Sequence, residues 1–335
     1  MTDLAHTDDC DLDGPLLFGR VLDGQGGARS IGWDQAKDWR PDAPGEVLWV
    51  HLCRSEPGVR EWLMDHLQVS EPTAELLTSD STRPRAFREG DTLVATLRGL
   101  NFNPGAEPED MVSMQVWCDG THLVTLRRVP LQTPRDTRDD LDDGHGAVDA
   151  GSLITSLTEH LIERMSHVVI DLDEAIDKLE EDEADCADKA MLDEISRVRR
   201  ECLALKRYMS PQHEALENIS SDAPDWFEDH DRREIAESID RLRRYVEDLD
   251  IAKESALVLQ DDVRARLLER NARTQSQLAI VATIFLPLTF LSGLIGMNVE
   301  GIPHAHDPLA FWKIVGLCVA IAGAQLLLFR RLKWF

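Results

Sequence analysis

Side chains that can bind a divalent cation gather within the thirteen residues 298–310, between two apolar stretches of the sequence. His304 and His306 offer imidazole nitrogens, and Glu300 and Asp307 offer carboxylate oxygens. Imidazole suits zinc better than magnesium, so this loop predicts a site that captures zinc. Two histidines two positions apart in an exposed loop are more often incidental, and this alternative stays open.

The apolar stretch before the loop carries a narrow helical face in which small, hydroxyl and amide side chains alternate with leucines. Steps of three and four place residues on one side of a helix, and the face consists of Gln275, Leu278, Ala282, Leu286, Thr289 and Gly293. Small residues let helices pack closely in a membrane. The same face can instead line a pore for a hydrated ion. One helical hairpin cannot enclose a pore, so the second interpretation requires several copies of the chain.

Two stretches are long and apolar enough to cross a bilayer. Residues 278–297 contain no charged side chain, and twenty residues at about 1.5 Å each match a hydrocarbon thickness of about 30 Å. Residues 311–329 contain one charge, Lys313, near an end where it can reach the interface. We expect a hairpin with both ends on the same side of the membrane.

Basic side chains flank this hairpin but are missing from its loop. The flanks contain Arg264, Arg266, Arg270, Arg273, Arg330, Arg331 and Lys333. The positive-inside rule therefore predicts a multi-pass protein of the cytoplasmic (inner) membrane, with both termini in the cytosol and the loop outside. The acidic N-terminus has neither the basic nor the apolar region of a signal peptide, which agrees with this orientation.

The rest of the sequence is strongly acidic. The 335 residues include 62 Asp and Glu against 36 Lys and Arg, a formal net charge of −26. A protein that binds nucleic acid needs a basic face, so this class of partner is excluded. The six cysteines form no C-x-x-C pair. A structural zinc site built from cysteine pairs is therefore excluded, and a disulfide framework is not expected in the cytosol.

The acidic part divides into an α/β domain, residues 1–146, and a long-helix region, residues 147–277, which precede the hairpin at 278–335. Strands are expected at Leu16–Val21, Val47–His51, Thr92–Leu97, Met111–Trp117 and His122–Leu126, and short helices at Val59–Leu67 and Ser70–Leu77. Asp119-Gly120 is typical of a hairpin turn. A Pro-, Asp- and Gly-rich linker is expected from Pro134 to Gly146.

Beyond the linker, apolar residues recur at helical spacing. Helices are expected over Leu153–Leu179, over Asp188–Ser220 with Pro211 kinking or splitting it, and from near Asp225 to Pro287. The third would be about 90 Å long, which indicates a stalk or coiled-coil arm that continues into the first apolar stretch. The acidic run Glu180–Glu183 lies at the tip between the first two, as a solvated turn or as a collar that concentrates cations.

Gly296-Met297-Asn298 ends the first of two C-terminal apolar stretches after a very long helix, and in this position it resembles the signature of the CorA superfamily of divalent-cation channels. Further segments resemble its zinc-transporting ZntB branch: Ser81–Arg85, Arg207–Gln212, Phe285–Pro287, Gly301–Pro303 and Lys333-Trp334. The resemblance implies a homopentamer with a funnel-shaped α+β cytosolic domain and a central pore lined by the first apolar helix. It also implies a divalent metal as the substrate, with zinc uptake linked to a proton gradient.

The same resemblance implies roles for single residues. Asn298 would form a ring of side-chain carbonyl groups that binds a hydrated ion at the outer mouth. Gly296 would let the helices approach closely, and Met297 would pack behind the ring. Along the pore-lining face, the implied apolar gates are Leu278 and Leu286 and the implied polar rings are Gln275 and Thr289.

Two features depart from the ZntB branch. That branch often replaces the middle residue of Gly-Met-Asn, whereas this chain keeps Met297, as magnesium-transporting relatives do. The branch also tends to have a glycine-rich loop where this chain has His304 and His306. Zinc stays the favoured substrate, with a CorA-type channel for magnesium, cobalt or nickel as the alternative.

Two other functions compete with transport. A membrane-anchored scaffold would tolerate leucine throughout its span, so the small and hydroxyl residues of the first span disfavour it. An enzyme in the N-terminal domain is disfavoured because His51, His66 and His122 are isolated there and no G-x-G-x-x-G, P-loop, H-E-x-x-H or G-x-S-x-G motif occurs. We expect no catalytic residue and no cofactor. The expected partners are further copies of the chain, the lipid bilayer and divalent cations.

Overall fold

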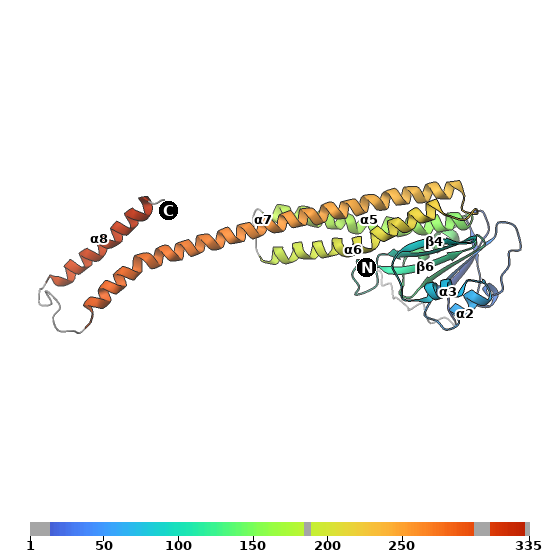
Figure 1. Ribbon diagram of the computed structural model, residues 1–335, viewed down its shortest axis with the longest axis horizontal. Coiled ribbons are helices and arrows are strands. Elements are labelled where there is room, and N and C mark those ends of the chain that lie inside the picture. Colours follow the sequence, from blue (N-terminus) through green and yellow to red (C-terminus); the bar gives the residue numbers. More distant parts are fainter. Residues whose placement is uncertain (1–13, 184–188, 298–308, 332–335) are drawn as a thin grey trace. The chain divides into compact units, whose positions relative to one another are not determined.

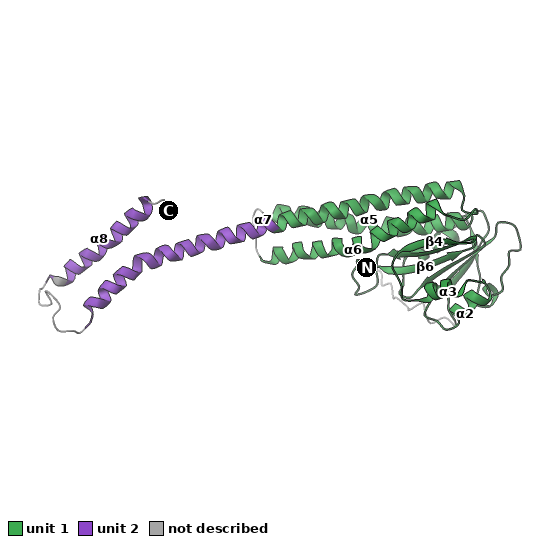
Figure 2. Cartoon of the chain, viewed as in Figure 1, with its two compact units in different colours: residues 1–260 green, residues 261–335 purple. Residues whose placement is uncertain are grey.

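The computed structural model describes residues 14–183, 189–297 and 309–331. The chain divides into two compact units, residues 1–260 and residues 261–335 (Figure 2). The first unit contains a β-sheet with helices on both faces, and the second contains the apolar helical segments (Figure 1).

Seven described strands form one sheet in the first unit. In chain order they are β1 (Leu16–Leu22), β2 (Ala28–Ser30), β3 (Val47–Cys53), β4 (Arg85–Glu89), β5 (Thr92–Gly99), β6 (Val112–Cys118) and β7 (His122–Arg127). Their order across the sheet is β2-β1-β3-β7-β6-β5-β4, and β3 and β7 are the parallel pair in an otherwise antiparallel arrangement. The five expected strands are confirmed, as is the turn at Asp119-Gly120, where Gly120 has a φ of +87° that glycine adopts without strain.

The described helices pack around this sheet and extend beyond it. They are α1 (Trp33–Ala36), α2 (Val59–Asp65), α3 (Glu71–Thr78), α4 (Thr133–Asp142), α5 (Ala150–Glu183), α6 (Lys189–Ser221), α7 (Asp229–Ile295) and α8 (Ala310–Arg331). Helix α3 begins after Ser70, whose hydroxyl accepts a hydrogen bond from the main-chain N–H of Thr73. The expected short helices α2 and α3 and the three long helices are therefore confirmed.

Both faces of the sheet are buried, which is why its central strands read as continuous apolar runs. On one face, Leu48 and Val50 of β3 share a core with Trp62 of α2 and Leu77 of α3. On the opposite face, residues of β5 and β6 lie against α5 and α6. Met114 of β6 is one of these residues. Figure 1 shows α2 and α3 on one side of the sheet and the long helices on the other.

The long helices lie side by side within the first unit. Arg241 of α7 donates to Glu159 of α5 at 2.8 Å, and Arg199 of α6 donates to Gln260 of α7 at 3.2 Å. Helix α7 has 67 residues, a length of about 100 Å at 1.5 Å per residue. One helix thus contributes both to the packed core of the first unit and to an apolar span.

The structure overturns one expectation about local structure, narrows a second and adds elements that were not expected. The segment predicted as a linker from Pro134 forms helix α4, because proline is compatible with the first helical turn and Thr137 and Leu141 bury one side of the helix. Pro211 does not split α6, which is one continuous helix around it. The strands β2 and β4 and the short helix α1 have no counterpart among the expected elements.

Candidate ion pathway in the apolar helices

Two described helices contain segments apolar and long enough to cross a membrane: the C-terminal part of α7 and residues 311–331 of α8. The predicted span from Leu278 lies in α7, which ends at Ile295, and Gly296 and Met297 follow that end. The main-chain N–H of Gly296 bonds to the carbonyl oxygen of Ser292 at 2.9 Å, so the last turn is closed. Asn298 and the predicted loop ligands lie outside the described residues.

The predicted pore face lies on one exposed side of α7. All six of its residues are exposed, with Leu278 at 64% and Leu286 at 75% of their full surface. Ile280, by contrast, is only 6% exposed, and Ile284 and Leu291 on its side of the helix are half-buried. At about 100° of rotation per residue, the two sides are about 180° apart. The predicted face is therefore available to further copies of the chain.

A hydrogen bond between the two apolar helices repairs a break in the ladder of α7. Pro287 has no N–H, so the carbonyl oxygen of Thr283, four residues earlier, has lost its helical donor. The side-chain amide of Gln325 on α8 donates to that oxygen at 3.0 Å. In a membrane a proline is tolerated when a neighbouring helix satisfies the freed group in this way. Gln325 thus joins α8 to α7 at Thr283, the residue four positions before the proline.

Sequence reasoning did not single out Gln325. The available signal was an amide side chain inside an apolar helix, together with a proline in the preceding span. A polar residue inside a span that faces another helix is costly to place and is usually functional or structural.

The acidic surface of the first unit includes carboxylates on α5 and α7. Burial raises the pKa of Asp173, and the nearby charges of Asp248 and Asp177 raise it further.

Residues 180–182 of the predicted acidic run are exposed in the last turn of α5 rather than in a turn outside it. Within the described residues, no group of three or more His, Cys, Asp or Glu side chains is placed to hold a metal. The role of the run as a cation-concentrating collar stays a prediction.

The arrangement of sheet, long helices and terminal apolar helices agrees with comparisons to known proteins. The CorA-like Mg2+ transporter protein family matches residues 44–331. The chain belongs to this family. Its members are transporters of divalent cations, not enzymes, and this chain is a divalent cation transporter of the CorA and ZntB type.

Individual relatives cover nearly the whole chain. The divalent cation transporter CmaX of Pseudomonas aeruginosa is 36% identical over 95% of this chain and 96% of its own length. The zinc transport protein ZntB of Pectobacterium carotovorum is 33% identical over 93% and 94%, respectively. The structure of full-length CmaX matches with a TM-score of 0.84, covering 97% of this chain and all of that one. The CorA magnesium transporter of Methanocaldococcus jannaschii, 15% identical, has the same fold with a TM-score of 0.78 over 95% of this chain and 98% of its own.

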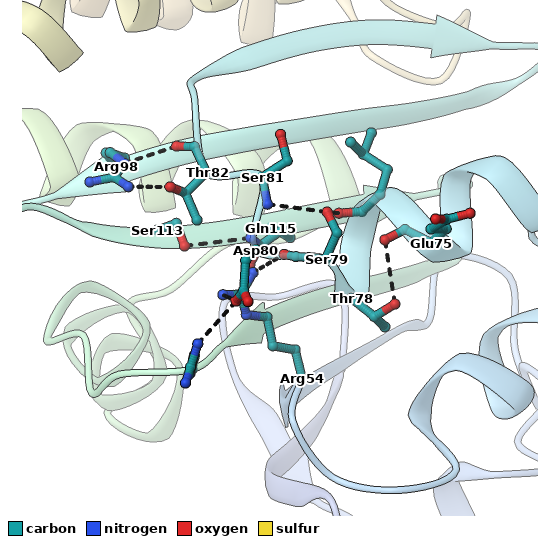
Figure 3. Close-up of polar contacts among 12 residues, drawn as sticks. Arg54, Glu75, Thr78, Ser79, Asp80, Ser81, Thr82, Arg98, Ser113 and Gln115 are labelled. Carbon is teal, nitrogen blue, oxygen red and sulfur yellow. Dashed lines mark hydrogen bonds and ion pairs between the residues drawn. The ribbon is translucent and has the colours of Figure 1, made fainter.

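Two segments that carry the family resemblance, residues 81–85 and 207–212, meet at Arg98 of β5. The guanidinium group of Arg98 donates to the carbonyl oxygen of Thr82 at 2.8 Å and also to its hydroxyl group (Figure 3). A third bond runs to the carbonyl oxygen of Met111 at 2.5 Å. Arg98 is 9% exposed, so these bonds replace the water that its charge would otherwise bind.

The second segment contacts the same arginine from the other side. The ring of Tyr208 lies 3.9 Å from the guanidinium carbon, a stacked cation–π contact. Gln212 accepts a hydrogen bond from the main-chain N–H of Arg98 at 2.6 Å, just beyond Thr96, where the pairing of β5 with β4 ends. Arg98 thus joins α6 to the loop before β4. The signal that the sequence offered is a charged residue near the end of an apolar strand.

The three histidines that the sequence shows as isolated lie in different surroundings. His51 and His122 are buried, and His66 lies 3.7 Å from Asp38 at the surface. Cys202 is buried, and burial raises the pKa of its thiol to about 11, which suppresses the reactive thiolate.

Proposed function

We propose that the chain transports a divalent metal cation, zinc in preference to magnesium, through a pore lined by the exposed face of α7. The exposed side of α7, opposite the side that faces α8, carries this proposal. A homopentamer would bring five such faces around one axis, with Asn298 of each copy at the outer mouth. Lipid bilayer would contact the remaining surface of the apolar helices.

The polarity of this face supports a path for a hydrated ion. Gln275 and Thr289 offer oxygens that can bind water of the ion's hydration shell, while Leu278 and Leu286 can close the path by excluding water. Ala282 and Gly293 leave room between them. A metal that keeps its inner waters can be selected by such weak contacts, and it then leaves as readily as it enters.

Zinc is favoured by the imidazole groups of His304 and His306, with the carboxylates of Glu300 and Asp307 beside them in sequence. Relatives named as zinc transport proteins add support. A magnesium channel is the second candidate, because Met297 keeps the Gly-Met-Asn sequence intact. Proton-coupled uptake is part of the zinc proposal.

The orientation that we propose places the chain in the cytoplasmic membrane with both termini in the cytosol. Basic residues at Arg264, Arg270 and Arg330 flank the apolar segments, and the intervening loop has none. Single cysteines introduced into the loop should react with a membrane-impermeant thiol reagent added to intact cells. Labelling only after lysis would overturn this orientation.

Ion flux into vesicles tests the transport proposal. The full-length chain, reconstituted in liposomes with a zinc- or magnesium-sensitive dye inside, should admit zinc faster than magnesium, and faster still with protons moving along their gradient. Asn298→Ala should abolish this preference. Asn271→Ala, at an exposed asparagine of α7 ahead of the apolar segment, is the matched control. If neither ion enters and Asn298→Ala has no effect, the proposal is wrong.

The loop histidines require a separate measurement. Replacing His304 and His306 together by alanine should raise the zinc concentration that gives half-maximal flux and leave magnesium flux unchanged. Equal zinc affinity in the variant would assign zinc selection to the pore alone. Native mass spectrometry of the detergent-solubilised chain tests the pentamer.

A further inference from the structure

The contact between the two apolar helices follows one side of each helix. On α7, residues at helical spacing are buried or half-buried: Ile280, Ile284, Pro287 and Leu291. On α8, the same spacing connects residues that are also buried or half-buried: Ile314, Cys318, Ile321, Gln325 and Phe329. The other sides of both helices are mostly exposed. Helix α8 therefore supports the apolar part of α7 from one side, and Gln325 places an amide within this largely apolar contact.

Pro287 makes this side of α7 the point where the helix bends most easily. A proline inside a helix provides no N–H for the carbonyl group four residues earlier, and its ring crowds that group, so bends concentrate there. The carbonyl group in question belongs to Thr283, and it accepts the hydrogen bond from Gln325 at 3.0 Å. The bond thus ties α8 to the turn of α7 in which the helical ladder is interrupted.

Gln325 serves this contact through its N–H donor. Its Nε2 donates to the oxygen of Thr283, whereas its Oε1 is buried and has no hydrogen-bond partner among the residues that the structure describes. Exchanging the two atoms would set Oε1 against the carbonyl oxygen of Thr283, and both of these atoms are acceptors. A buried acceptor without a partner costs stability. A side chain that only filled the contact would therefore be apolar, and the donor is the part of Gln325 that the structure uses.

The residue immediately before the proline is Leu286, the apolar gate of the proposed path. Leu286 is 75% exposed, and at about 100° of rotation per residue it lies about 160° from Ile284 of the contact side. A side chain opposite the support of a bend moves whenever the angle of the bend changes. A ring of leucines excludes water only when the copies meet at one distance from the pore axis. The position of Leu286 therefore depends on a fixed bend at Pro287.

We propose that Gln325 is a positioning residue for ion transport: its hydrogen bond to Thr283 fixes the bend of α7 and thereby holds Leu286 in register with the same leucine of the other copies. This inference rests on the proposed function, in which the exposed face of α7 lines the pore. Gln325 itself lies on the contact side and does not touch the ion. Without its bond the bend angle varies, the leucine ring loses its register, and zinc crosses more readily down its own gradient.

Gln325→Met tests this role, because methionine keeps the length of the side chain and lacks the N–H donor. In the full-length chain reconstituted in liposomes, zinc flux down a fixed zinc gradient with no proton gradient should rise about fivefold, the factor that corresponds to one lost hydrogen bond. The zinc concentration that gives half-maximal flux should not change, because Gln325 does not contact the ion. In a Pro287→Ala background Gln325→Met should have no effect, because the background restores the helical N–H.

Ile321→Ala is the matched control, because Ile321 lies one turn before Gln325 on the same contact side and offers no hydrogen bond. It should lower the thermal stability of the chain in detergent without raising the basal zinc flux, which separates positioning from packing. Gln325→Asn, whose amide is one carbon too short to reach Thr283, is a second variant with the same expected rise as Gln325→Met. It serves should Gln325→Met fail to reconstitute.

A second readout does not need transport. In a Leu286→Cys background, the rate of reaction with a charged methanethiosulfonate reagent should rise about fivefold when Gln325→Met is added, for the same lost bond. It should not rise when Ile321→Ala is added. Mass spectrometry of the peptide that contains position 286 measures this rate separately from the other cysteines of the chain.

The role of Gln325 and the transport proposal fail in different ways. A parent chain that moves neither zinc nor magnesium would overturn the transport proposal, and the thiol rate would still report on Gln325. A parent chain that transports, with Gln325→Met at the parental basal flux and thiol rate, would overturn the role of Gln325 alone. An equal rise from Ile321→Ala, or a rise that persists in the Pro287→Ala background, would assign the effect to helix packing and overturn it as well.

Discussion

The side-chain amide of Gln325 donates to the main-chain carbonyl oxygen of Thr283, 42 positions earlier in the chain, at 3.0 Å. This is the carbonyl group that Pro287 leaves without a helical donor. The proline and the glutamine are therefore a matched pair on two different helices. Each would be unfavourable in an apolar span without the other.

Gln325→Leu should destabilise the full-length chain by about 1 kcal/mol, because the carbonyl group of Thr283 then has no donor. In a Pro287→Ala background the helical N–H at position 287 is restored, and the same substitution should cost much less. Urea or thermal unfolding in detergent measures both sides of this cycle. Equal losses in the two backgrounds would show that Gln325 contributes independently of the proline.

Two threonines of the same span allow the predicted pore face to be compared with the rest of the helix, because Thr289 lies on that face and Thr283 does not. Thr289→Val should reduce zinc flux by about fivefold, the rate equivalent of one hydrogen bond worth about 1 kcal/mol. Thr283→Val is the matched control, since its hydroxyl group bonds to the carbonyl oxygen of Ala279 within α7. Vesicle flux at equal protein density is the measurement. A larger effect from Thr283→Val would contradict the assignment of the face.

Leu286 occupies the same exposed face one turn before Thr289. Leu286→Ser should raise the basal flux of zinc down a fixed zinc gradient with no proton gradient imposed, because a hydroxyl group holds water where leucine excludes it. Leu294→Ser, at a leucine that is not on the predicted face, serves as its control. Unchanged leak in Leu286→Ser would remove this leucine as a gate.

Arg98→Met should destabilise the first unit by about 2–4 kcal/mol. The change keeps the length of the side chain but leaves the carbonyl oxygens of Thr82 and Met111 without their donor. Arg98→Lys should not restore stability, because an ammonium group cannot reproduce the planar contacts of a guanidinium group. Arg128→Met, at an exposed arginine, should cost less than about 1 kcal/mol. Denaturant unfolding followed by circular dichroism compares the three.

Asp231, near the start of α7, should make stability depend on pH. Its side chain is fully buried, and this burial raises its pKa to about 6. The negative charge of Asp149 raises the pKa further, whereas a hydrogen bond from the main-chain N–H of Glu228 opposes the rise. The folded state therefore holds the proton more tightly than the unfolded state. Stability is highest below pH 3.8 with respect to this group and falls as pH rises to about 6.

Asp231→Asn should remove this fall and stabilise the chain at pH 7.5 by up to about 3 kcal/mol. Urea midpoints between pH 4 and pH 7.5 test it. His230 lies 3.2 Å from the carboxylate of Asp231, so His230→Gln is the control and should retain the fall. An Asp231→Asn variant as pH-dependent as the parent chain would assign the effect to other groups.

The sequence was informative wherever one residue type repeats at a regular interval. Strand β3 is an almost continuous apolar run because it is buried at every position, and apolar residues recur at helical spacing along α7. Strand β4 (Arg85–Glu89) reads as polar because it is an edge strand, and its pairing with β5 arises only in the folded sheet. Helix α4 reads as a linker because its proline and aspartates dominate its composition.

The candidate sites divide in the same way. The face that contains Leu286 and Thr289 was predicted from spacing alone, and its role as a pore lining stays a prediction. Arg98 and Gln325 could not, because each acquires its role from a partner that is distant in the sequence. Arg98 needs Gln212, 114 positions away. Local pattern identifies such a residue as unusual, but only the fold identifies what it contacts.

The placement of both apolar segments at the end of the chain has a consequence for biosynthesis. The parallel pairing of β3 with β7 completes the sheet by residue 127, whereas the first apolar segment begins near Leu278. At roughly 5–20 residues per second, the ribosome takes on the order of ten to thirty seconds to cover that interval. The sheet is therefore expected to fold on the nascent chain before the first apolar segment has been made.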